Sequence, residues 1–145
     1  MTSTYSLRCQ HGDAMAMIDR MHGLLGRFDG ADDAAQIMLL LAKLTQLMRV
    51  HFAQEDYCLY PALIASQDPE VAEAAAAFQR EMGELWEQFE GFVRRWSTLT
   101  AIILHFDEFK GECITIFAAI DDRCTRENDL LFPLVDAASQ TSLAA

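Results

Sequence analysis

The amino-acid sequence predicts an all-α fold, a single up-down-up-down four-helix bundle over residues 1–145. Gly and Pro are sparse, with 7 and 3 residues, whereas residues that favour long helices, such as Ala, Leu, Met, Gln and Glu, are frequent. Apolar residues also recur at alternating steps of three and four in four separate segments, as they do along the buried seams of helical bundles. With 145 residues, of which 52% are hydrophobic, the chain has enough material for one domain with a sizeable core and too little for two.

The first helix is predicted to begin near Ser3 or Thr4, either of which can act as its N-cap. It should end before the turn at Asp29 and Gly30. One polar residue, His11, interrupts its otherwise apolar seam. That seam contains Leu7, His11, Ala14, Ile18, Met21, Leu25 and Phe28.

The second helix is predicted to begin around Asp32 or Asp33 and to extend to about Ser66. Pro61 should bend it or end it early, because proline removes a backbone donor and clashes with the preceding turn. Two polar residues lie on its seam, which contains Ile37, Leu41, Leu44, Met48, His51, Glu55, Cys58 and Ala62.

The third helix has a strong start signal in Asp68-Pro69-Glu70 and is predicted to continue to about Trp96. This signal combines an N-cap, a proline at the first helical position and an acid near the positive end of the helix dipole. Its seam is wholly apolar and contains Phe78, Met82, Leu85, Phe89, Phe92 and Trp96.

The fourth helix is predicted to span Asp107 to Ala137, after a longer connection that opens at residues 97–100. Two polar residues, Arg123 and Glu127, lie on its seam. The seam contains Phe109, Cys113, Ile116, Ile120, Arg123, Glu127, Leu130 and Leu134.

The five polar seam residues call for a common explanation, because burying them costs several kcal/mol unless partners or a metal satisfy them. A fold-back near residue 30 places His51 opposite residue 9 and within a turn of His11. A turn near residues 67 and 68 places Glu55 opposite residue 80, beside Met82 on the third helix. We therefore expect His11, His51 and Glu55 to lie at one level of the bundle.

A weak internal repeat places the remaining two polar residues at the same level. The pair His51-x-x-x-Glu55 is followed by Leu59-Tyr60-Pro61, and Arg123-x-x-x-Glu127 is followed at identical spacing by Leu131-Phe132-Pro133. Two equivalent helices would bring the second pair to the height of the first. The sequence therefore predicts one buried polar site.

This pattern resembles the hemerythrin-like (HHE) cation-binding domain family over nearly the whole chain. The matching motifs are the histidine in Leu7-Arg-Cys-Gln-His11, the pair His51-x-x-x-Glu55 before Tyr60-Pro61, and Glu127 before Leu131-Phe132-Pro133-Leu134. The resemblance implies metal-ligand roles for His11, His51, Glu55 and Glu127. It implies that the glutamates bridge two non-haem irons and that the histidines are terminal ligands.

Two departures from the family pattern reduce this ligand set. Met82 stands where the third helix of the family carries a histidine, and Arg123 stands at the fourth-helix histidine position. We therefore expect either a depleted site that holds non-haem iron or a single zinc, or a metal-free hydrogen-bonded layer. With metal, Arg123 should turn away or pair with Glu81 or Glu84. Without metal, it should bridge Glu55 and Glu127, because a guanidinium can pair with two carboxylates.

A weaker resemblance links the tail Arg123 to Ala138, with a loose match around His51-Phe52, to the regulator of sigma D family. It implies a different class of function, a metal-independent helical bundle that binds a sigma factor. Such a regulator needs a protein surface and an ion-paired core layer of Arg, Glu and His.

Composition and missing motifs exclude several functions. A formal charge of −11 disfavours nucleic acid and anionic membrane surfaces as partners. No signal peptide, membrane helix, phosphate loop or nucleophile with its base is recognisable, so we expect a cytoplasmic protein that is not an enzyme. The expected role is a sensor or regulatory module with a protein partner. His22 and His105 should be surface or boundary residues, and the four cysteines should be reduced, small core residues.

Overall fold

The computed structural model describes residues 4–144, with the side chains of residues 4–138, and this part of the chain is helical without a strand. The all-α prediction is therefore confirmed for the described residues. The elements are α1 (Thr4–Gly26), α2 (Ala31–Gln54), η1 (Glu55–Leu59), α3 (Tyr60–Ile64), α4 (Pro69–Arg95), α5 (Leu99–Leu104), α6 (Phe106–Arg126), η2 (Glu127–Leu131) and α7 (Phe132–Ala144).

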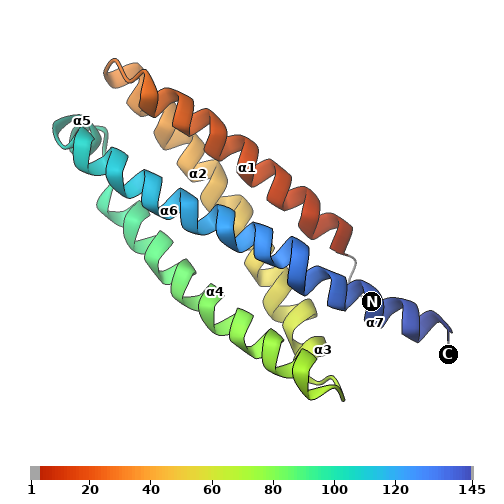
Figure 1. The fold of residues 1–145 in the computed structure, drawn as a ribbon. Coiled ribbons are helices and arrows are strands. Elements are labelled where there is room, and N and C mark those ends of the chain that lie inside the picture. The colour runs from red at the N-terminus through yellow and green to blue at the C-terminus, as the bar shows by residue number, and fades with distance from the viewer. Residues whose placement is uncertain (1–3, 145) are drawn as a thin grey trace.

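The long elements pack side by side along one common direction (Figure 1). The elements α2, η1 and α3 follow one another without a break, as do α6, η2 and α7. With α1 and α4, these two composite segments run alternately up and down (Figure 1). The prediction of four helices alone is not confirmed, because α5 forms in the third connection, where the Thr98 side chain accepts a hydrogen bond from the backbone N–H of Ala101 and Ile102 is buried.

The first two turns agree with the sequence signals. Gly30 has φ 119°, which a residue with a side chain rarely adopts, and this turn reverses the chain between α1 and α2. The Asp68 carboxylate caps α4 by accepting a hydrogen bond of 3.0 Å from the backbone N–H of Glu70. These local signals explain why the starts of α2 and α4 were predictable to within a residue or two.

The core lies along the four predicted seams, which are buried up to Glu55 and Glu127 except for the half-buried Phe28. Beyond each glutamate the predicted seam is wrong by one residue. Leu130 is 58% exposed, whereas its neighbour Leu131 is fully buried. The same shift exposes Cys58 and Ala62 and buries Leu59 and Leu63, and it leaves Val135 buried and Leu134 half-buried.

This shift has a backbone cause, because η1 and η2 are π-helical turns. The backbone N–H of Tyr60 donates to the carbonyl of Glu55, and that of Phe132 donates to the carbonyl of Glu127, in each case five residues back. A π-helical turn contains an extra residue and therefore changes which residues face the core.

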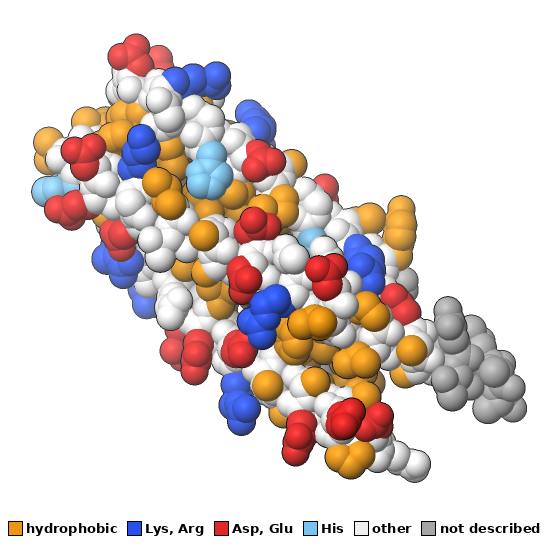
Figure 2. All heavy atoms as spheres, in the orientation of Figure 1, with side chains coloured by type: hydrophobic (Ala, Val, Ile, Leu, Met, Phe, Trp, Pro, Cys, Tyr) orange, Lys and Arg blue, Asp and Glu red, His pale blue; other side chains and the backbone are white. Residues whose placement is uncertain are grey.

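The cysteine prediction is correct in part. Cys113 and Cys124 are buried, Cys9 and Cys58 are exposed, and none of the four forms a disulfide. Exposure of Cys58 follows from the π-helical turn. Within the described residues, no helix combines the length and apolar character needed to cross a membrane. Charged side chains of both signs are scattered over the face seen in Figure 2, with apolar side chains between them.

Candidate metal centre

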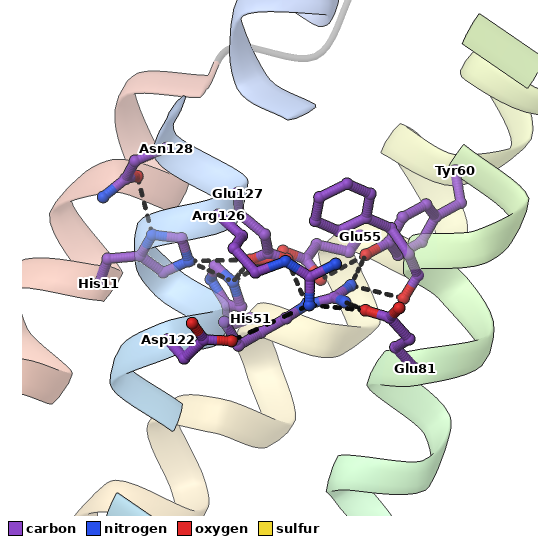
Figure 3. Close-up of polar contacts among 11 residues, drawn as sticks. His11, His51, Glu55, Tyr60, Glu81, Asp122, Arg126, Glu127 and Asn128 are labelled. Atoms are coloured by element: carbon purple, nitrogen blue, oxygen red, sulfur yellow. Dashed lines mark hydrogen bonds and ion pairs between the residues drawn. The ribbon is translucent and has the colours of Figure 1, made fainter. Parts of the chain in front are cut away.

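The polar seam residues meet inside the bundle, as the sequence predicted. Figure 3 shows four of them together, His11, His51, Glu55 and Glu127. Among the described side chains, the buried polar ones are Thr4, His11, His51, Glu55, Arg123 and Glu127. All but Thr4 belong to one connected group. The helices α1, α2 and α6 and the π-helical turns η1 and η2 supply this group, so elements distant in the sequence build one site.

Four of these side chains aim ligand atoms at a common point. The Nε2 atoms of His11 and His51 are 3.1 Å apart, and His11 Nε2 is 3.0 Å from Glu127 Oε1. His51 Nε2 is 2.8 Å from Glu55 Oε1. The four ligand atoms all lie within 4.8 Å of one another. The structure thus brings together the four residues that the sequence singled out, while their role as ligands stays a prediction.

The opposite nitrogen of each imidazole has an amide oxygen as its partner. His51 Nδ1 is 2.7 Å from Oε1 of Gln10, whose Nε2 donates to Oε1 of Gln54 at 3.1 Å. His11 Nδ1 is 2.9 Å from Oδ1 of Asn128. Because an amide oxygen only accepts, each Nδ1 carries a hydrogen, and Nε2 is left as the ring nitrogen that can direct a lone pair into the cluster when it holds no proton.

These donors fit a cation. Two Nε2 lone pairs that face each other at 3.1 Å repel unless a proton or a positive ion lies between them. Glu55 Oε1 is buried without a hydrogen-bond partner, since its contact with His51 lacks hydrogen-bond geometry. The four close spacings among these atoms, 2.8–3.5 Å, match those expected of adjacent ligands around one ion with bonds of about 2.0–2.2 Å. His, His, Glu and Glu is also a donor set that suits non-haem iron or zinc.

Burial and mutual contact shift the protonation of the cluster. Burial raises the pKa of Glu55 to about 8, although the nearby imidazole of His51 opposes this. Burial also disfavours charge on Glu127, but hydrogen bonds from His11 and His51 outweigh it and hold its pKa below the usual range. For His51, burial lowers the pKa, yet the two carboxylates raise it to about 9. Protons therefore occupy the metal-free cluster, and a metal would displace them on binding.

Arg123 occupies the other side of the cluster and points toward α4. Its Nη2 donates hydrogen bonds of 2.6 Å to the Tyr60 hydroxyl and 2.6 Å to the carbonyl of Phe78. Its Nη1 is 3.5 Å from Oε2 of Glu81, one of the two α4 acids predicted to pair with it. The guanidinium is thus turned away from the two imidazoles.

The bridge from Arg123 to both carboxylates, which we expect of a site without metal, is direct on one side only. Arg123 Nε is 3.3 Å from Glu127 Oε2, but the guanidinium reaches Glu55 only through Tyr60. The Tyr60 hydroxyl donates to Glu55 Oε2 at 3.4 Å while it accepts from Arg123. The strong bonds to Tyr60 and to the Phe78 carbonyl account for this direction.

Sequence reasoning missed the outer partners of the site. Gln10 and Asn128 lie next to His11 and Glu127 in the sequence, and Tyr60 is the middle residue of the Leu59-Tyr60-Pro61 motif. The sequence therefore indicated that they lie near the site but not where their side chains point. Phe132, the counterpart of Tyr60, stacks on the His11 ring with centroids 5.2 Å apart. Met82 is buried on α4, and no α4 side chain belongs to the cluster found among the described residues.

A bundle of antiparallel helices with histidine and carboxylate ligands aimed into its core defines a class, the helical cation-binding bundles. The hemerythrin HHE cation binding domain model matches residues 2–135, and the chain belongs to this family. The match agrees with the first resemblance drawn from the motifs and does not favour the sigma-factor regulator. Neither the curated proteins nor the solved structures yielded a match to this chain.

Proposed function

We propose that this chain is a cation-binding regulatory module in which His11, His51, Glu55 and Glu127 hold one non-haem metal ion, iron or zinc. The observation that carries the proposal is the convergence of two imidazole Nε2 atoms with two buried carboxylate oxygens, while the opposite nitrogen of each imidazole contacts an amide oxygen. A cation satisfies all four atoms at once. Such an ion would supply positive charge to the two buried carboxylates.

A sensing role suits this site better than turnover of an organic substrate. The cavity beside the cluster has a volume of about 20 Å³, room for a water-sized molecule and little more. Apolar side chains form much of its wall, among them Leu47, Met48, Phe52, Leu85 and Ile120. A buried site with so small a cavity favours detection of an ion or of a very small ligand, and we propose that the protein is not an enzyme.

The first experiment tests metal binding directly. Chelator-stripped protein is incubated with Zn²⁺, or with Fe²⁺ under anaerobic conditions, desalted and subjected to elemental analysis. We expect stoichiometric metal in the wild type. In His51→Ala the affinity should fall by more than about 100-fold, because loss of a ligand exceeds the 10–100-fold cost of losing an outer partner.

The matched control is His22→Ala, which removes an exposed histidine of α1 outside the cluster. This control should bind metal like the wild type. A wild type that stays metal-free after loading, or a His51→Ala variant that binds equally well, contradicts the proposed site.

The regulatory part of the proposal needs a partner, for which we propose a cytoplasmic protein. A pull-down with metal-loaded and chelator-stripped protein, each checked for folding by circular dichroism, tests it. Capture that depends on bound metal supports sensing, whereas equal capture in both states contradicts it.

A further inference from the structure

Each of the two oxygens of the Glu127 carboxylate contacts a different partner in the bundle core. Oε1 is 3.0 Å from His11 Nε2, on the side of the candidate metal site. Oε2 is 3.3 Å from Arg123 Nε, on the side of α4. One carboxylate therefore lies between the imidazole cluster and a guanidinium.

Glu55 is divided in the same way. Its Oε1 is 2.8 Å from His51 Nε2. Its Oε2 accepts a hydrogen bond of 3.4 Å from the Tyr60 hydroxyl, which in turn accepts one of 2.6 Å from Arg123 Nη2. Both carboxylates thus present one oxygen to the imidazoles and the other to Arg123 or its hydrogen-bonded tyrosine.

The Arg123 guanidinium is a permanent feature of the core. It is only 4% exposed, it donates to the Phe78 carbonyl, and its carbon lies 4.7 Å from the centre of the Phe78 ring. Glu81 lies on its outer side at 3.5 Å. Because a guanidinium does not lose its proton in proteins, this position always carries one positive charge.

We propose that Arg123 is a built-in second cation, which limits the site to one metal ion and keeps the site assembled when that ion leaves. The inference rests on the proposed function and specifies its stoichiometry. Two carboxylates, one guanidinium and one divalent ion leave a net charge of +1, whereas a further divalent ion would raise it to +3 in a buried layer. The outer carboxylate oxygens are also already occupied.

The same contacts explain how the site would survive without its metal. Buried carboxylates that lose a cation are left without a partner, which strongly destabilises a fold. Here Arg123 and Tyr60 continue to satisfy their outer oxygens. The bundle can therefore bind and release an ion while it stays folded, as a reversible sensor requires.

Zinc stoichiometry tests this inference in four forms of the 145-residue chain, the wild type, Arg123→Lys, Arg123→His and Arg126→His. Each is stripped with chelator, loaded with excess Zn²⁺, desalted and measured by elemental analysis, with folding checked by circular dichroism. Arg123→Lys retains a positive charge beside the carboxylates. Arg123→His replaces the charge with a neutral ligand next to the freed oxygens and Glu81. Arg126 also pairs with Glu81, at 2.7 Å, but lies outside the buried cluster.

We expect one zinc per chain in the wild type, in Arg123→Lys and in Arg126→His, and two in Arg123→His. Two zinc ions in the wild type or in Arg123→Lys would overturn the inference while leaving the proposed metal site intact. One zinc in a folded Arg123→His variant would also overturn it. If that variant does not fold, the number of zinc ions bound by the wild type and by Arg123→Lys still tests whether a positive charge at residue 123 limits the site to one ion. A wild type without zinc instead defeats the proposed function itself.

Discussion

The composite segments α2–η1–α3 and α6–η2–α7 share a backbone design. Each reaches the site with a long α-helix, makes a π-helical turn that begins at a glutamate, and continues through an aromatic residue and a proline. The glutamates are Glu55 and Glu127, and the aromatic residues are Tyr60 and Phe132. The weak repeat in the sequence therefore corresponds to a repeat in the structure.

The two segments differ in the side chain four residues before the glutamate. His51 directs its Nε2 toward His11, whereas Arg123 extends toward α4 and the Phe78 carbonyl. A similar backbone thus supplies an imidazole, the proposed metal ligand, in one segment and a fixed positive charge in the other. The comparison teaches that the π-helical turn positions the carboxylates, while the side chain four residues earlier decides whether they face a candidate metal ligand or a permanent positive charge.

The largest expected effect comes from removing the fixed charge. In metal-free protein, Arg123→Ala should lower the free energy of unfolding by about 3–5 kcal/mol, because a buried carboxylate loses its partner. Urea denaturation followed by circular dichroism measures this change. The control is Arg126→Ala, which removes a more exposed arginine that also pairs with Glu81, and it should change stability by only about 0.5 kcal/mol. Equal losses in the two variants would show that the core charge has no special role.

The second prediction tests whether the π-helical turn η2 determines which residues of η2 and α7 face the core. Leu131→Ala should cost about 2–5 kcal/mol, as expected for truncating a fully buried leucine, whereas Leu130→Ala should stay within about 0.5 kcal/mol. Urea midpoints of the two variants give the comparison. A larger loss for Leu130→Ala would indicate the ordinary α-helical register that the heptad pattern predicted.

Most of the fold was predictable because its signals are local. Steps of three and four identified the seams, and Asp68-Pro69 and Gly30 marked two turns. The heights of the polar residues followed from those turns by counting along antiparallel helices. For this reason the residue spacing alone is sufficient to place His11 and His51 at one level.

The register beyond each glutamate was not predictable from the same pattern. Leu130 and Leu131 are adjacent and both apolar, so the heptad pattern admits either as the core residue. Only the hydrogen bond from Phe132 to the Glu127 carbonyl distinguishes them. The direction of Arg123 was equally hidden, because it depends on bonds to groups distant in the sequence.

The smallest expected effect concerns the residues that orient the imidazoles. His51 in α2 contacts the amide oxygen of Gln10 in α1, whereas His11 in α1 contacts the amide oxygen of Asn128 in η2. Gln10→Met removes the acceptor, so the Nδ1 hydrogen of His51 is no longer fixed and zinc affinity should fall about 10–100-fold. Competition with a chromophoric chelator measures the affinity.

The control Gln10→Glu keeps an acceptor oxygen and should bind zinc with an affinity within about tenfold of the wild type. Asn128→Leu should weaken binding as much as Gln10→Met does, because the two partners act on equivalent nitrogens. If Gln10→Met and Gln10→Glu bind equally well, the amide partner does not orient the ligand, and the helix alone positions His51.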